Sequence, residues 1–212
     1  MTVDITSESI IELKFVEPFV GESKLEDTVH CLNVIDYAEQ QPELWNESMT
    51  VGGDDSGSVN KEFRDSSQIN YPPNHYAPCH KPVLEFAGSC LESYIIQKPE
   101  VNNFGRYGVR ESFNVIKYEP GQAYHSTHSD YAPFHSVMER RHLTFIMFLN
   151  SVADGGELEF VGQNLKITPE EGKAIIFPSG WTHSHRSLPA SETRYIFQLW
   201  WSFLPPGESL ND

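Results

Sequence analysis

From Ser112 onward, short runs of β-branched and aromatic residues alternate with turns rich in Gly, Pro and Asp. These runs have the length and composition of strands rather than of helices. Several short strands separated by turn signals are typical of an all-β sandwich or barrel. The predicted strands are Phe113–Lys117, Leu143–Leu149, Leu158–Val161, Lys173–Phe177 and Tyr195–Phe203. The sequence therefore predicts a mainly β core over residues 112–203.

The first half of the chain has a different pattern. Apolar residues recur at helical spacing in Leu25–Gln41 and Val83–Ile96, which predicts two amphipathic helices, while Ile10–Val16 is typical of a short strand. Asn46–Asn60 is rich in Gly, Ser and Asp and is expected to be a loop, either a lid or a plain surface loop. No repeat or linker divides the halves, so we expect the helices to pack on the outside of the barrel.

The length of 212 residues fits one compact domain, and the aromatic content of 12% can supply its core. We predict that residues 1–111 form a mostly helical or looped support region. Residues 112–203 carry the core and the site, and residues 204–212 are expected to be a loose polar tail.

Acidic residues outnumber basic residues by 30 to 15, which gives a formal net charge of −15. This argues against a nucleic-acid partner, because basic patches bind phosphate backbones, and it suits a solvated surface or a basic substrate. The N-terminus has no signal-peptide pattern, and no stretch approaches the roughly 20 apolar residues of a membrane span. Cys31, Cys79 and Cys90 lack the spacing of a zinc or redox motif and are expected to be free thiols. We therefore expect a cytoplasmic protein with no membrane partner.

A group of metal-ligand residues lies in the strand region. His128 and Asp130 are two residues apart, so in an extended strand both side chains could point at one atom. A later strand could bring His185 to the same barrel mouth. Two imidazoles and one carboxylate form a facial triad, which leaves positions on iron(II) open. Arg194 is a forked cation that suits a carboxylate ligand.

The nine histidines leave other arrangements open. His125 and His183 lie near the motif, and strand parity alone does not choose between His183 and His185. A closed structural zinc site would need four protein ligands, most often including Cys, and no Cys lies nearby. The alternatives to a metal site are that the histidines are surface residues in loops and that Arg194 forms a surface ion pair.

Several further segments agree, in order, with one known family. They are Tyr118–Tyr124, Arg141–Thr144, Phe148–Asn150, Gly155–Leu158, Gly172–Ser179, Pro189–Ala190 and Thr193–Tyr195. With these motifs, residues 112–203 resemble the prolyl-hydroxylase-like iron(II)/2-oxoglutarate dioxygenases, a group with procollagen, hypoxia-factor and viral or bacterial members. The resemblance implies a double-stranded β-helix, or jelly-roll, barrel. A shorter match, over Arg64–Ser66, resembles a segment on the substrate side of these enzymes.

The resemblance also implies the ligands of the metal. In similar proteins the distal histidine stands eight residues after the Phe of the preceding strand and nine before the Arg. His185 stands eight residues after Phe177 and nine before Arg194, so it meets both spacings, whereas His183 fits only with a shift. His128, Asp130 and His185 are therefore expected to bind Fe(II).

The co-substrate 2-oxoglutarate is expected to pair its distal carboxylate with Arg194. By resemblance, Tyr118 and Thr144 face the co-substrate. A tyrosine that often donates to that carboxylate is replaced here by Phe148, so the second donor must come from elsewhere, with Thr144 and Tyr118 as candidates. Ascorbate is a further cofactor that the resemblance allows.

The implied reaction uses O2 to hydroxylate a prolyl residue or a related peptidyl or amino-acid carbon, with decarboxylation of 2-oxoglutarate to succinate. Related halogenases have a small residue in place of Asp130, so the carboxylate favours hydroxylation. Alternatives are a dioxygenase of a small metabolite, a non-catalytic metal-binding barrel and a zinc hydrolase. The expected partner is a peptide or small-molecule substrate, and the sequence leaves the oligomeric state undefined.

Several residues near the predicted metal ligands could hold them in position. Ser129, Ser184 and Trp181 are candidates for orienting the ligands, with rim packing as the alternative for Trp181. Strand alternation predicts that Trp200 and Trp201 point to opposite faces, one into the barrel and one outward.

Overall fold

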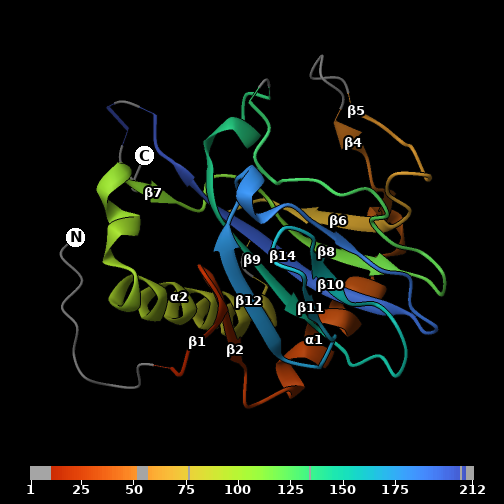
Figure 1. Ribbon diagram of the computed structural model, residues 1–212. Helices are drawn as coiled ribbons and strands as arrows, with labels where there is room; N and C mark the ends of the chain where they lie inside the picture. Colours follow the sequence, from red (N-terminus) through yellow and green to blue (C-terminus); the bar gives the residue numbers. More distant parts are fainter. Residues whose placement is uncertain (1–10, 52–56, 76, 134, 206, 209–212) are drawn as a thin grey trace.

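The computed structural model describes residues 11–51, 57–75, 77–133, 135–205 and 207–208. Its centre is a sheet of nine strands in the order β1-β2-β12-β9-β14-β8-β6-β3, with β7 paired to β14 (Figure 1). All pairings in this sheet are antiparallel. The strands are β1 Lys14–Glu17, β2 Val20–Lys24, β3 Asn46–Glu47, β6 Ser67–Tyr71, β7 Tyr107–Gly108, β8 Phe113–Tyr118, β9 Arg141–Phe148, β12 Lys173–Pro178 and β14 Arg194–Phe203.

A smaller sheet packs on one face of the main sheet. It has the order β11-β10-β13, and a separate two-stranded ribbon joins β4 to β5. These strands are β4 Thr50–Val51, β5 Gly57–Ser58, β10 Leu158–Phe160, β11 Leu165–Ile167 and β13 His185–Ser187. The two sheets enclose a shared apolar cluster that includes Phe148, Phe160 and Phe177. This jelly roll confirms the predicted mainly β core.

Strand alternation divides the core into two layers. On β9, Phe145 and Met147 point to one face, and Ile146 and Phe148 to the other. The same alternation on β14 places Trp201 in the helix-side layer, whereas Trp200 lines the cavity on the opposite face. The prediction that the two tryptophans face opposite ways is confirmed.

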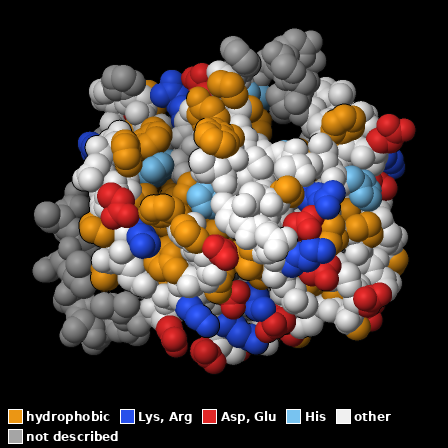
Figure 2. All heavy atoms as spheres, in the orientation of Figure 1, with side chains coloured by type: hydrophobic (Ala, Val, Ile, Leu, Met, Phe, Trp, Pro, Cys, Tyr) orange, Lys and Arg blue, Asp and Glu red, His pale blue; other side chains and the backbone are white. Residues whose placement is uncertain are grey.

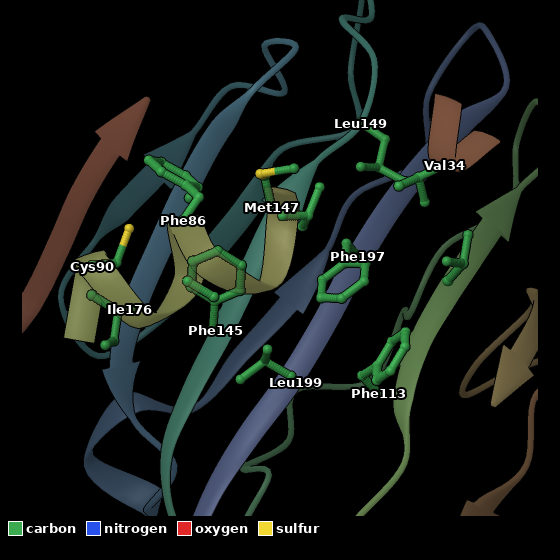
Figure 3. Packing of buried hydrophobic residues seen from close by; sticks show 14 of the residues in the cluster. Val34, Phe86, Cys90, Phe113, Phe145, Met147, Leu149, Ile176, Phe197 and Leu199 are labelled. Atoms are coloured by element: carbon green, nitrogen blue, oxygen red, sulfur yellow. The ribbon is translucent and has the colours of Figure 1, made fainter. Parts of the chain in front are cut away.

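Two helices cover the outer face of the main sheet. They are α1 Val29–Glu39 and α2 His80–Gln97, and Figure 3 shows Phe86 and Cys90 of α2 beside residues of β9 and β12. The helices therefore lie outside the barrel, as predicted. Helix α2 begins three residues before the predicted start because Pro82 falls in its first turn, where the missing N–H of proline is tolerated. Short 3-10 turns are η1 Pro42–Leu44, η2 Pro99–Phe104, η3 Met138–Arg140 and η4 Trp181–His183.

The prediction of a mostly helical or looped support region is incomplete. Strands β1 and β2 extend one edge of the main sheet, and β6 and β3 extend the other. In β6 only Ile69 and Tyr71 are buried, and the polar residues between them hide the strand signal. The predicted loop 46–60 contains β3, β4 and β5, while its residues 52–56, like part of the predicted tail, lie outside the described residues.

The surface carries a mixture of charges. On the face shown in Figure 2, Lys and Arg side chains lie interspersed with Asp and Glu. No helix in the described part of the chain has both the length and the apolar run that a membrane span needs.

The buried side chain of His80, at the start of α2, should make the stability of the protein depend on pH. Its ring is fully buried against Tyr71 and Phe113, and neither ring nitrogen has a hydrogen-bond partner among the described residues. Burial, with a smaller effect of His75, lowers the pKa of His80 to about 4. The unfolded chain takes up this proton near pH 6.5, so the stability contribution is complete above that pH and is lost as pH falls toward 4. The loss amounts to about 3 kcal/mol.

We expect His80→Phe to remove this part of the pH dependence. The measurement is urea unfolding of wild type and variant at several pH values between 7 and 4. The free energy of unfolding of the variant should rise relative to that of wild type as pH falls, because only the wild type loses the contribution of His80. Two curves that stay parallel over this range would contradict the expectation.

Candidate functional site

A cavity of about 810 Å³ lies between the two sheets. The inward positions of β14 form one side of it: Arg194, Ile196, Gln198 and Trp200. Because these residues alternate along one strand, their side chains share the face that looks toward the smaller sheet. The predicted metal ligands line the same cavity.

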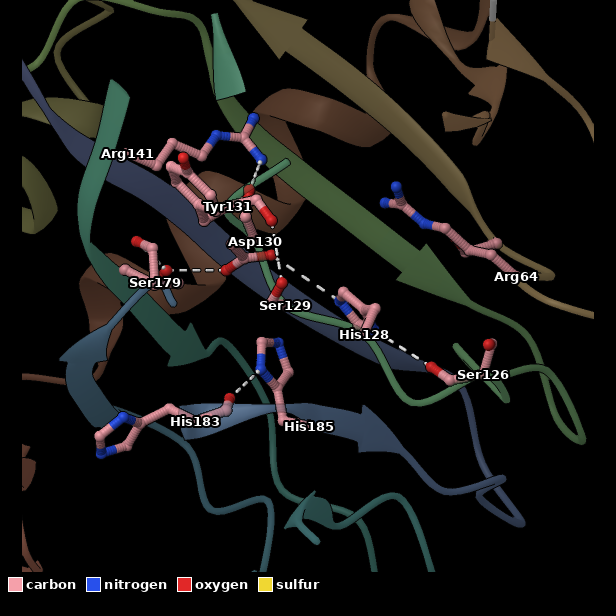
Figure 4. Close-up of polar contacts among 12 residues, drawn as sticks. Arg64, Ser126, His128, Ser129, Asp130, Tyr131, Arg141, Ser179, His183 and His185 are labelled. Atoms are coloured by element: carbon pink, nitrogen blue, oxygen red, sulfur yellow. Dashed lines mark hydrogen bonds and ion pairs between the residues drawn. The ribbon is translucent and has the colours of Figure 1, made fainter. Parts of the chain in front are cut away.

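His128, Asp130 and His185 converge in this cavity. Their ligand atoms lie within 4.8 Å of one another, and Figure 4 shows the three side chains turned toward a common centre. His185 begins β13, whereas His128 and Asp130 lie in the connection between β8 and β9. The expected regular strand is reduced to one bridge, in which the backbone N–H groups of His128 and His185 each donate to the other residue's carbonyl at 2.9 and 2.8 Å.

Backbone carbonyls set the protonation of both imidazoles. Nδ1 of His128 lies 3.1 Å from the carbonyl oxygen of Ser126, and Nδ1 of His185 lies 3.0 Å from that of His183. A carbonyl can only accept, so each Nδ1 carries the proton and each Nε2 keeps its lone pair free. Nε2 of His128 is 3.7 Å from Oδ1 of Asp130. Both rings are therefore prepared to bind a metal through Nε2.

Electrostatics favour the ligand forms of these groups. Burial, reinforced by His185, lowers the pKa of His128, so its ring is neutral near pH 7. Burial alone would raise the pKa of Asp130, but His185, His128, Arg141 and the Thr144 hydroxyl lower it below its ordinary value. A neutral imidazole and an ionised carboxylate are the states that bind a metal ion.

Arg194 lies deep in the same cavity and is 1% exposed. Nη1 donates to the carbonyl oxygens of Gly156 and Leu188, while Nε and Nη2 have no partner among the described residues. Burial lowers the pKa of Arg194, and Tyr118 and Glu157 oppose that shift. Arginine keeps its charge in proteins, so two buried donors remain for a carboxylate. The alternative of a surface ion pair does not fit this burial.

Two glycines allow the chain to approach this guanidinium. Gly155 and Gly156 have φ values of +77° and +76°, which side-chain-bearing residues rarely adopt. A Cβ atom on Gly155 would overlap the carbonyl oxygen of Pro189, and one on Gly156 would lie 3.3 Å from Nη1 of Arg194. The Gly-Gly pair therefore positions a carbonyl against Arg194 without filling the cavity.

Comparison with known proteins identifies this part of the chain. Residues 113–202 match the 2OG-Fe(II) oxygenase superfamily. These residues belong to that family. The oxygenase region is 36% identical to Prolyl 4-hydroxylase 13 of Arabidopsis thaliana, over 37% of this chain and 38% of that protein. It is 29% identical to Probable prolyl 4-hydroxylase 9 of the same plant, over 42% of this chain and 40% of that protein. The matches thus cover about two fifths of these relatives.

Solved structures show the same fold over most of this chain. A viral collagen prolyl hydroxylase from Paramecium Bursaria Chlorella virus-1, in a 2OG complex, aligns with a TM-score of 0.65 at 18% identity. That alignment covers 88% of this chain and 97% of the viral one. A prolyl hydroxylase from Trichoplax adhaerens, in complex with a hypoxia inducible factor peptide fragment, aligns with a TM-score of 0.63 at 18% identity. It covers 87% of this chain and 83% of that chain.

The side chains present fit the groups that this oxygenase family implies. Iron(II) accepts two imidazoles and a carboxylate, and the triad supplies this set. A dicarboxylic keto acid needs a cation for its far end, and the two unpartnered donors of Arg194 meet that need.

The structure brings His185 into the oxygenase triad and places His183 elsewhere. His183 lies in the turn η4, where its ring nitrogens contact the carbonyl oxygen of Pro18 and the hydroxyl of Thr182. The parity argument left both histidines open because it assumed a continuous strand. His125 is half-buried and is not among the residues that line the cavity. Among the described residues, the triad is the one converging set of metal-ligand side chains, and it contains three residues rather than the four of a closed zinc site.

Thr144 has a different contact from the expected one. Its hydroxyl donates to Oδ2 of Asp130 at 2.7 Å and lies 2.9 Å from the hydroxyl of Ser179. Thr144 therefore orients the carboxylate of Asp130, and it is not among the residues that line the cavity. Tyr118 lines the cavity beside Arg194, whose guanidinium lies 4.3 Å from the centre of its ring, and Phe148 lines the same cavity.

The residues expected to orient the metal ligands make no side-chain hydrogen bond with those ligands among the described residues. Ser129 and Ser184 donate to the backbone carbonyls of Tyr131 and Trp181, and the Trp181 side chain is largely exposed. Thr144 and the carbonyls of Ser126 and His183 take over this task. Carbonyl contacts of this kind depend on loop geometry, so residue types alone do not reveal them.

Arg141 supports the segment that carries His128 and Asp130, and the sequence did not predict this role. Its guanidinium binds both carboxylate oxygens of Glu111, donates to the carbonyl of Asp130 at 3.1 Å and lies 3.6 Å from the ring centre of Trp200. The Tyr124 ring stacks on His128 with centres 3.6 Å apart. Both contacts fix the backbone that carries two of the ligands.

Removing the Thr144 hydroxyl should weaken metal binding at the triad. Thr144→Val keeps the shape of the side chain but leaves Oδ2 of Asp130 without its donor. The loss of a residue that orients a ligand typically lowers metal affinity by about 10- to 100-fold. Calorimetric titration with Mn(II) measures the effect, with the exposed Thr168→Val as a matched control. An affinity equal to that of wild type would show that Thr144 does not orient the ligand.

Proposed function

We propose that this chain is an iron(II)- and 2-oxoglutarate-dependent dioxygenase that hydroxylates a prolyl residue or a related carbon of a peptide or amino acid. The reaction would convert 2-oxoglutarate to succinate. The observation that carries this proposal is the presence of the His128–Asp130–His185 triad and the unpartnered donors of Arg194 in one cavity. A carboxylate-binding cation next to a triad suits a keto acid that also binds the metal.

The iron would be held by the triad and would supply open coordination positions and oxidising chemistry. The protein's own residues bind and orient. The carbonyls of Ser126 and His183 hold protons on the outer imidazole nitrogens, and Thr144 holds the carboxylate of Asp130. Arg194 binds the distal carboxylate of 2-oxoglutarate, with Tyr118 against its guanidinium. Apolar side chains that keep water from this end of the cavity are Ile146, Phe148, Leu158 and Ile196.

A peptidyl substrate is supported by the relatives and by the size of the cavity. Proteins named as prolyl hydroxylases match the oxygenase region, and one similar structure holds a peptide fragment. The cavity extends beyond the triad to Trp45, Arg64 and Val137, which leaves room for residues on either side of a target side chain. The formal charge of −15 favours basic peptides among the candidates.

A peptide screen tests the proposal. Purified protein with Fe(II), 2-oxoglutarate and ascorbate is incubated with Pro-rich and basic peptides, and with free proline and other amino acids as small-molecule competitors. We expect at least one peptide to gain the mass of one oxygen, with one succinate formed for each oxygen gained. Oxygen gain in free amino acids but in no peptide would contradict the peptidyl assignment. His185→Ala should abolish both products.

A further inference from the structure

Two carboxamide side chains in the cavity wall have no hydrogen-bond partner among the residues that the structure describes. Asn114 of β8 and Gln198 of β14 are each 7% exposed, and both line the cavity. The polar atoms of neither amide are fully enclosed by protein, so within the described residues they open onto the cavity and are accessible to a ligand. An apolar pair would suit a wall that only packs, so these two amides indicate that the wall binds a polar ligand.

The two amides belong to a row that crosses three strands. Asn114 stands directly opposite Gln198 in the pairing of β8 with β14, and directly opposite Asn70 in the pairing of β6 with β8. Paired residues on antiparallel strands share a face, and all three residues line the cavity. The strands β6, β8 and β14 lie side by side in Figure 1. We call Asn70, Asn114 and Gln198 the carboxamide row.

Arg64 determines how the amide of Asn70, at one end of the carboxamide row, is oriented. Its Nη2 donates to Oε1 of Gln68 at 2.7 Å, and Nε2 of Gln68 donates to Oδ1 of Asn70 at 2.6 Å. Arginine cannot accept a hydrogen bond, so the orientation of both amides follows from it. Asn70 therefore keeps its Nδ2 donors for a ligand, while Asn114 and Gln198 can each both donate and accept.

The other end of the carboxamide row, at Gln198, is connected to the triad through Trp200 and Thr144. Gln198 is followed on the same face of β14 by Trp200, which pairs with Thr144 of β9. Thr144 in turn donates to Asp130. A molecule bound along the row would therefore extend toward the residues of the triad.

We propose that the carboxamide row binds the backbone amides of an extended peptide that crosses β6, β8 and β14 to reach the triad. This inference rests on the proposed function and specifies a peptide in place of a free amino acid. Adjacent strands are about 4.8 Å apart, so three strands span about 10 Å, the length of about three residues of extended chain. A peptide group presents one donor and one acceptor, which a carboxamide side chain complements.

Two matched probes test the carboxamide row without turnover. One is N-acetyl-Ala-Pro-Ala-N-methylamide, and the other is its analogue with ester oxygens in place of the amide N–H groups. Both are titrated by NMR into protein loaded with Zn(II) and 2-oxoglutarate. Wild type should bind the amide at least about fivefold more tightly, because the ester lacks the N–H donors and leaves amide acceptors unpaired.

Asn114→Leu and Gln198→Met should each remove most of this preference, while the exposed Asn33→Leu should keep it. The thermal midpoints of the two cavity variants should stay close to that of wild type, because neither amide makes a hydrogen bond to the described residues and both face the cavity. Equal affinity for the two probes, no binding of either, or a preference retained in both cavity variants would overturn the inference. The affinity for 2-oxoglutarate, measured on the same samples, separates the two proposals. Its absence in wild type contradicts the proposed function, whereas its presence without an amide preference contradicts only the carboxamide row.

Discussion

Arg194→Met is expected to weaken the binding of 2-oxoglutarate by about two orders of magnitude. The guanidinium is buried and keeps Nε and Nη2 without partners among the described residues, so the distal carboxylate would gain a charge-assisted pair there. Removing one member of a buried, hydrogen-bonded charge pair costs about 2–5 kcal/mol, which is roughly 30-fold to several thousand-fold in affinity. Isothermal titration of Zn(II)-loaded protein with 2-oxoglutarate measures the change.

Two further variants sharpen this test of Arg194. Arg194→Lys keeps the charge but loses the forked geometry, so its affinity should fall between those of wild type and Arg194→Met. Arg140→Met removes a partly exposed guanidinium and should bind like wild type. Without ligand, Arg194→Met should be at least as stable as wild type, because a buried charge with unpaired donors destabilises the fold. Unchanged 2-oxoglutarate affinity in Arg194→Met would remove this residue from the site.

His185→Ala should abolish stoichiometric metal binding. His185 supplies one of three converging ligand atoms, and its Nδ1 contact with the His183 carbonyl leaves Nε2 available to the ion. Two remaining ligands in an open site hold a divalent ion only weakly. Anaerobic titration with Fe(II) should give one ion per wild-type chain and no saturable binding by the variant in the micromolar range.

The matched control for His185 is His183→Gln. His183 is only two residues away and also buried, but its ring contacts Pro18 and Thr182 instead of the triad. Glutamine can keep one of these polar contacts, so the variant should bind one Fe(II) per chain. Loss of metal from His183→Gln with retention by His185→Ala would reverse the ligand assignment.

Much of the barrel was predictable because its strands are strongly patterned. In β9 and β14 nearly every residue is buried on one face or the other, so the apolar runs are continuous. Strand alternation also placed Trp200 and Trp201 correctly. Toward the sheet edges, β1 overlaps the strand predicted over Ile10–Val16. Strands β2 and β6 escaped prediction, because they have few apolar residues and gain their order from pairing with β12 and β8.

The candidate site, like the barrel, could be predicted only in part. Ligand types and spacing indicated His128, Asp130 and Arg194, whereas His183 and His185 both stayed open until the family resemblance favoured His185. The contact between Thr144 and Asp130 was not predictable, because it joins β9 to a loop whose path is set by tertiary packing. The carboxamide row was also hidden, because its members are far apart in sequence and become neighbours only through strand register.

The most direct test of the oxygenase centre is succinate formation by the purified chain. Wild type given Fe(II), 2-oxoglutarate and O2 should release succinate even without a substrate peptide, at a slow uncoupled rate. Omission of Fe(II), or the His185→Ala change, should reduce the release to background. A wild-type protein that binds both Fe(II) and 2-oxoglutarate yet forms no succinate, alone or with any peptide of the screen, would contradict the account and favour a non-catalytic metal-binding barrel.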